Sequence, residues 1–165
     1  MANRWYYGSE LLYCCDVITL TARCDCFRVN EMERFMSDNL QEGRAFLAAK
    51  ETEDGVVALP SGLLYKVIET GDGATPGPRD NVTVHYRGTL IDGTTFDSSY
   101  DRGTPATFPV NRVIAGWVEA LQLMTVGSKW ELYIPSEMAY GRAGAGGDIG
   151  PDCALIFEVE LLKIV

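Results

Sequence analysis

A two-residue alternation of apolar and polar side chains is the feature that most constrains this chain, and it recurs through residues 61–165. In "NVTVHYRGTL" the side chains of Val82, Val84 and Tyr86 share one face, and His85 lies on the other. Alternation of this kind is typical of a strand with one buried face, because successive side chains of a strand point in opposite directions. The sequence therefore predicts an antiparallel sheet in this part of the chain.

Five further stretches have strand character, and glycine or proline punctuates the sequence between them. They are "GLLYKVIE", "TTFDSS", "ATFPV", "SKWELYIP" and "ALIFEVELLKIV". One helical pattern interrupts the strands: "NRVIAGWVEAL" begins at Asn111 and is expected to end near Gly127. The pattern predicts an α+β fold, in which one short helix packs on an antiparallel sheet of five or six strands.

The N-terminal part of the chain differs from the rest. In residues 36–60, Asp38 and Gln41 resemble a helix capping box and Gly55 supplies a stop, which predicts a short N-terminal helix followed by a linker. Residues 1–35 show no period of 2 or 3.6. We interpret them as an unassigned extension, either disordered or an over-extended start.

The charge of the chain excludes several kinds of partner. A formal charge of −9 would repel a phosphate backbone on average, so nucleic acid is not an expected partner. No apolar run approaches the roughly 20 residues of a membrane helix, and Asp16 breaks the best candidate for a signal segment, "LLYCCDVITL". The sequence therefore predicts a cytoplasmic protein with no membrane partner.

Four of the five cysteines crowd the N-terminal region, at Cys14, Cys15, Cys24 and Cys26. Their spacing is not that of a usual zinc site, and no histidine lies nearby. We expect free thiols, with no metal and no cofactor. A thiol or zinc switch formed by these cysteines is the alternative hypothesis.

Residues for acid–base or nucleophilic chemistry are scarce. His85 is the only histidine, and the strand alternation turns it away from Tyr86. Asp97 and Asp101 are close in sequence, but no further group completes a hydrolase or metal site around them. The remaining candidates are aromatic residues from separate elements, which can form either an ordinary core or an open aromatic cup.

The predicted helix favours the cup. If Asn111 is its N-cap, the backbone N–H groups of the first turn, from Arg112 to Ile114, have no partner within the helix and can bind a carbonyl. Trp117 lies one turn further on, so its ring can form the floor of a pocket beside these donors.

Three long stretches, "VHYRGTLIDGTTFDSS", "FPVNRVIAGWVEALQLM" and "AYGRAGAGGDIGPDCALIFEVELL", resemble those of the FKBP-type peptidyl-prolyl cis-trans isomerases. The resemblance covers about residues 61–165. Together with "NLQEGRAFLAAKETEDGV", it is closest to the Mip-like bacterial branch. It implies a twisted antiparallel sheet wrapped around the short helix, and an enzyme that accelerates rotation about X-Pro bonds and assists protein folding.

Carried over by position, the resemblance implies a proline pocket. Its residues would be Tyr86, Phe96, Asp97, Phe108, Val113, Ile114, Trp117, Tyr140, Ile149 and Phe157. Trp117 would be the floor, and the Ile114 N–H and Tyr140 hydroxyl would bind carbonyls of a proline-containing polypeptide. Asp97 would accept a hydrogen bond that orders the pocket, with Tyr140 as its candidate donor.

The sequence departs from the family pattern at Ala106, Ala145 and Asp148, where many eukaryotic members carry a pocket aromatic, a histidine and an isoleucine. We therefore expect weakened affinity for macrolide inhibitors. The sequence predicts only one short helix of the longer dimerising region found in the Mip-like branch, which disfavours a homodimer. The alternative function is a proline-binding chaperone or adaptor that retains the pocket with little turnover.

Overall fold

The computed structural model describes residues 25–165, with side chains from Asp38 onward. The strands follow one another along the chain in the predicted order. The helices are α1 (Asp25–Glu51) and α2 (Ala115–Leu121), with short 3₁₀ turns η1 (Val110–Arg112), η2 (Ser136–Met138) and η3 (Gly141–Ala143). The strands are β1 (Val56–Ala58), β2 (Leu64–Glu69), β3 (Asn81–Leu90), β4 (Thr95–Ser98), β5 (Ala106–Pro109), β6 (Lys129–Ile134) and β7 (Leu155–Ile164).

The strands form one antiparallel sheet in the order β1-β2-β6-β7-β3-β4, and β5 also pairs with β3. The α+β class is confirmed, and so is each of the six predicted strand stretches. The sheet has seven strands rather than five or six. The additional strand is β1, whose three residues are too few to show an alternation.

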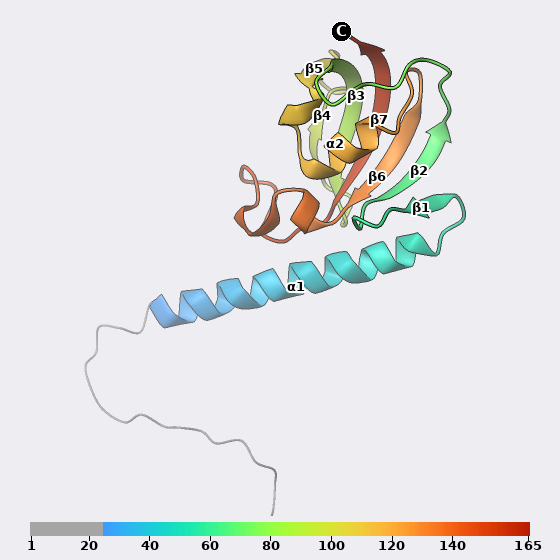
Figure 1. Cartoon of the computed structure of the whole chain (residues 1–165). Coiled ribbons are helices and arrows are strands. Elements are labelled where there is room, and N and C mark those ends of the chain that lie inside the picture. The colour runs from blue at the N-terminus through green and yellow to red at the C-terminus, as the bar shows by residue number, and fades with distance from the viewer. Residues whose placement is uncertain (1–24) are drawn as a thin grey trace, which may run out of the picture.

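The helix α2 lies against the concave face of the sheet, as Figure 1 shows. Gly116, Trp117, Ala120 and Leu121 are the buried residues of this helix. Gly116 allows the close approach: a Cβ there would lie 2.7 Å from the side chain of Ile134 on β6. The predicted short helix is confirmed, but it ends at Leu121 and not near Gly127.

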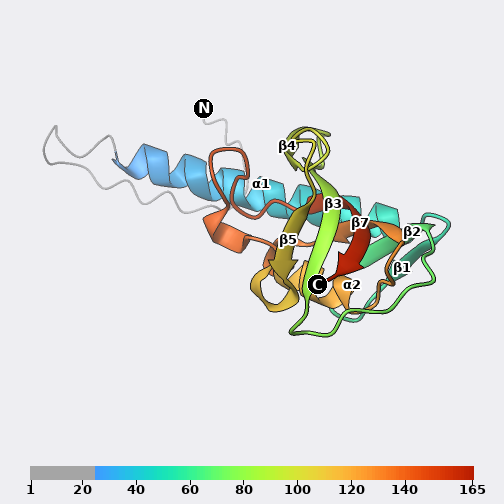
Figure 2. The same ribbon diagram turned by 90° about the horizontal axis from the view of Figure 1, so that it is seen from above.

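The helix α1 crosses the lower end of the sheet (Figure 1) and runs alongside it when viewed from above (Figure 2). Its Phe46 ring meets Tyr133 of β6 edge-on at 6.1 Å. Asn39 Nδ2 donates to the carbonyl of Pro151 at 3.0 Å. A Cβ on Gly43 would lie 3.1 Å from Cβ of Ala154, so the helix packs closely on the residues that precede β7.

The predicted start of this helix is wrong. α1 begins at Asp25, and Asp38 lies inside it rather than at its cap. No glycine or proline occurs between Gly8 and Gly43 to interrupt a helix, and a pattern of Asp and Gln in a cap spacing can equally occur on a helix surface. The expected division after residue 35 falls within α1. Residues 25–35 of the expected extension are therefore helical and not disordered. Residues 1–24 lie outside the described residues, so the nature of that part stays a prediction.

Within residues 25–165, no helix is long and apolar enough to cross a membrane. The same residues contain no group of three or more His, Cys, Asp or Glu side chains placed to hold a metal ion. Cys14, Cys15 and Cys24 lie outside the described residues, as does the side chain of Cys26. The thiol hypothesis is therefore untested.

Candidate functional site

A cavity of about 370 Å³ opens between the start of α2 and the concave face of the sheet. It is lined by Tyr86, Phe96, Asp97, Phe108, Arg112, Val113, Ile114, Trp117, Tyr140 and Phe157. The structure thus brings together nine of the ten predicted pocket residues. Ile149 is not among the lining residues: it is 9% exposed, and its N–H and C=O bond with Ala145 at 3.2 and 3.0 Å, which closes a loop beside the cavity.

Aromatic rings form the walls and the floor of this cavity. Trp117, which is 4% exposed, meets the rings of Tyr86, Phe108 and Phe157 edge-on, at centroid distances of 5.3, 5.8 and 5.3 Å. Its indole N–H is buried and has no hydrogen-bond partner among the described residues. Trp117 therefore belongs both to the core and to the cavity. The two alternatives for the aromatic residues, an ordinary core and an open cup, are both true of this ring.

The start of α2 differs from the prediction. The N-cap is Ile114, and Asn111 lies in the preceding 3₁₀ turn, which the extended residue Val113 separates from α2. The expected cap at Asn111 is therefore wrong. Ile114 C=O accepts from the N–H groups of Trp117 and Val118 at 3.0 and 3.1 Å. No hydrogen bond within the described part of the chain uses the Ile114 N–H, so this donor remains available at the cavity wall.

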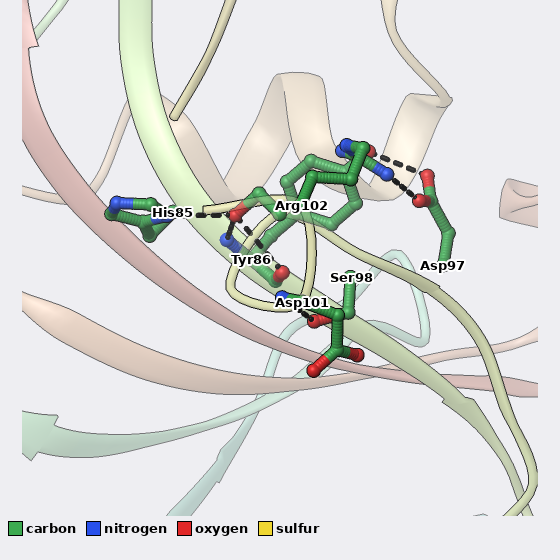
Figure 3. A network of polar contacts seen from close by, with 7 residues as sticks. His85, Tyr86, Asp97, Ser98, Asp101 and Arg102 are labelled. Carbon is green, nitrogen blue, oxygen red and sulfur yellow. Dashed lines mark hydrogen bonds and ion pairs between the residues drawn. The ribbon is translucent and has the colours of Figure 1, made fainter. Parts of the chain in front are cut away.

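Three polar side chains form a network at the side of the cavity (Figure 3). The Tyr86 hydroxyl donates to Asp97 Oδ2 at 2.5 Å, and Arg102 Nη2 donates to the Tyr86 oxygen at 2.8 Å. Arg102 also forms an ion pair with Asp97. Asp97 is thus an acceptor that orders the pocket. Its donors are Tyr86 and Arg102, so the prediction of Tyr140 as the donor is wrong. Arg102 was not predicted, and its only signal in the sequence is its position five residues after Asp97.

The network sets the charges at this side of the cavity. Burial raises the pKa of Asp97, but the hydrogen bonds from Tyr86 and Arg102, with the Arg102 charge, outweigh burial and leave the pKa below its ordinary value. Burial and the hydrogen bond to Asp97 raise the pKa of Tyr86. At neutral pH the site therefore holds a carboxylate, a neutral phenol and a guanidinium.

His85 lies on the opposite face of β3 from Tyr86, as predicted. Its ring stacks on Tyr100 at a centroid distance of 4.8 Å, and its Nδ1 lies 2.9 Å from Ser99 Oγ. Ser99 Oγ in turn accepts from the Tyr86 N–H at 2.8 Å. His85 is therefore a half-buried structural residue that contacts the cavity only through the backbone behind Tyr86.

Comparison with known sequences gives a consistent result. Residues 73–162 match the profile described as "FKBP-type peptidyl-prolyl cis-trans isomerase", and residues 24–67 match the domain amino terminal to it. The chain is 52% identical to "Outer membrane protein MIP" of Legionella longbeachae, over 83% of this chain and 59% of that protein. It is 58% identical to the "FKBP-type 22 kDa peptidyl-prolyl cis-trans isomerase" of Escherichia coli, over 75% of this chain and 60% of that protein. It therefore spans less than two thirds of the length of these two relatives.

Among solved structures, the chain is similar to FkpA from Escherichia coli. The TM-score is 0.82 at 43% sequence identity, and the match covers 87% of this chain and 67% of that one. The similarity includes both the sheet and part of the N-terminal helical region, since 87% of the chain is more than residues 61–165 alone.

Proposed function

Because this chain belongs to the FKBP-type peptidyl-prolyl cis-trans isomerase family, we propose that it accelerates cis/trans rotation about X-Pro bonds in proline-containing polypeptides and so assists their folding. The observation that carries the proposal is the aromatic cavity with a buried tryptophan and a free backbone N–H at one wall. A cavity of this kind can take a proline ring and hold a neighbouring carbonyl.

The chemistry requires no covalent step. Rotation about a peptide bond faces a barrier of roughly 18–20 kcal/mol because amide resonance must be broken, and at X-Pro bonds it takes tens to hundreds of seconds. The planar amide is the more charge-separated form. Transfer from water into an apolar cavity therefore removes solvation that stabilises planarity, while the twisted form loses less.

Different residues of the cavity bind different parts of the substrate. Trp117 holds the prolyl ring at the floor, and the Ile114 N–H binds a substrate carbonyl. The hydroxyl of Tyr140, a residue that is 39% exposed, can bind a second carbonyl from the rim. The Asp97–Arg102 pair fixes the Tyr86 ring that forms one wall. Binding energy from these contacts favours the twisted amide over the planar one.

We expect the purified protein to accelerate exchange of a short X-Pro peptide, with a preference for a bulky apolar residue before proline because the cavity walls are aromatic. Exchange spectroscopy by NMR, with a peptide in large excess over micromolar protein, measures the rate without a coupled protease. Binding of the peptide without any acceleration would favour the alternative function, a proline-binding chaperone or adaptor.

We expect the catalytic efficiency to stay nearly constant between about pH 6 and 8, because no group at the cavity exchanges a proton during the reaction. It should fall only once the pH lies below the ordinary carboxyl pKa and Asp97 takes up a proton in the folded protein. The depressed pKa of Asp97 means that its stabilising contacts are complete above the ordinary carboxyl pKa, near 3.9, and are lost as the pH drops through the lower folded value.

The control is His85→Gln, which removes the only histidine and should leave this profile unchanged. Measurements on folded protein at each pH, checked by circular dichroism, separate loss of activity from unfolding. A bend near neutral pH that disappears in His85→Gln would contradict the desolvation mechanism and make His85 a catalytic residue.

Three narrower expectations stay predictions: the cytoplasmic location, the weakened macrolide affinity and a homodimer that is possible but disfavoured. The reason given against the homodimer, a single short N-terminal helix, does not hold, because α1 has 27 residues. The macrolide prediction is supported by the lining of the cavity, since Ala106, Ala145 and Asp148 do not reach it and supply no aromatic wall on their side.

A further inference from the structure

We propose that Arg112 makes the site selective for substrates that carry an acidic side chain close to the proline. This inference rests on the proposed isomerase function and adds a substrate class to it. Arg112 lines the cavity, and the sequence predicts a role for its backbone N–H as a carbonyl donor but none for its side chain. It lies at the end of η1, two residues before Ile114 with its free N–H.

Arg112 differs from the other arginine at this site. Arg102 is occupied by Asp97 and by the Tyr86 hydroxyl. The Arg112 side chain is exposed, and within the described residues its guanidinium forms no ion pair and no hydrogen bond. The cavity wall therefore presents one uncompensated positive charge, in a chain whose formal charge is −9.

No acidic side chain within the described residues forms an ion pair with this charge. Asp97 is the only carboxylate that lines the cavity, and its charge is already matched by Arg102. Asp101 and Asp148 are exposed and are not lining residues. A substrate carboxylate is thus the natural partner for a guanidinium, which binds carboxylates through two parallel hydrogen bonds.

The backbone geometry limits where that carboxylate can lie. An extended peptide advances at most about 3.3–3.6 Å per residue, and Arg112 lies only two residues before Ile114 in the chain that forms the wall. If the Ile114 N–H binds a carbonyl next to the prolyl bond, Arg112 can reach a side chain one or two residues away. The residue directly before proline stays apolar, because it meets the aromatic wall.

The test compares peptide pairs that differ only by Glu or Gln, placed one or two residues from the X-Pro pair on either side. The measured quantity is the ratio of kcat/KM for the Glu peptide to that for its Gln partner. In at least one position we expect a ratio of about 3, the effect of one exposed charge pair, falling toward 1 in about 1 M salt. Arg112→Gln should bring the ratio to about 1, and Arg112→Glu should invert it.

Lys163→Gln is the matched control, because it makes the same change in net charge at an exposed residue that pairs with Thr83, away from the cavity. It should keep the ratio of the unmodified protein. An Arg112→Gln variant that keeps the ratio, or that slows both peptides equally, overturns the proposal.

The Gln peptide alone reports the proposed isomerase function. If it binds without being isomerised, the isomerase function fails, and the same ratio taken from Kd values still decides the role of Arg112. Failure of both peptides to bind would overturn both proposals.

Discussion

Replacement of Trp117 by alanine is expected to remove about 3–5 kcal/mol of stability and most of the peptide affinity together. The ring is 4% exposed and contacts three other aromatic side chains, so truncation leaves a large void at the centre of the domain. It also removes the surface on which a proline ring would lie. Since domains are stable by about 5–15 kcal/mol, the variant should still fold in part at low temperature.

Denaturant unfolding gives the stability, and peptide binding at 10 °C, scaled to the folded fraction, gives the affinity. Trp117→Phe is the matched variant, because it keeps an aromatic platform and removes an indole N–H that has no partner among the described residues. It should lose clearly less of both. If Trp117→Ala lowered the stability while the folded protein bound peptide normally, Trp117 would be a core residue and nothing more.

Gly88→Ala is the second large effect that we expect, with a loss of about 1–3 kcal/mol of stability and impaired turnover. Gly88 lies on β3 opposite Phe157 of β7. A Cβ there would lie 2.5 Å from Phe96 Cζ and 2.8 Å from Phe157 Cε1, closer than real contacts allow. Both rings line the cavity and meet edge-on at 5.5 Å, so one of them must move.

The comparison is Gly147→Ala, at a glycine whose added Cβ would meet nothing within 4 Å. This control should keep its stability or gain about 0.4–1 kcal/mol, because alanine restricts the unfolded chain. Thermal unfolding and the peptide assay on both variants test the pair. Equal behaviour of the two variants would mean that the aromatic rings adapt without cost and that Gly88 does not shape the cavity.

The sheet could be predicted because its signal is local. The longer predicted strands carry their own alternation, which is clearest in β7, and the alternation in β3 correctly separated Tyr86 from His85. β1 was missed because its three residues are held by pairing with β2 rather than by a pattern of their own. The start of α1 was missed because a cap-like pair inside a helix looks the same as one at its end.

The site was predicted less completely, because its polar details depend on contacts between distant residues. The aromatic set could be identified from the family motifs, and the structure gathers nearly all of it. The partner of Asp97 depends on how the turn after β4 folds back, which brings Arg102 onto Tyr86. Arg112 has no apolar period or motif to mark it, and only its place in the cavity wall distinguishes it from an ordinary surface arginine.

The antiparallel pairing of β3 with β7 has a consequence for folding during synthesis on the ribosome, because β3 is made well before β7. β3 pairs with β7 from Val82 to Leu90, and α1 packs through Phe46 on Tyr133. A ribosome adds about 5–20 residues per second, so these early elements wait roughly 4–20 s for their partners. Phe157, one wall of the cavity, is among the late residues. A nascent chain that has not yet reached β7 therefore has no complete cavity. The edge of β3 that pairs with β7 stays unpaired until then, and an unpaired strand edge is prone to aggregation.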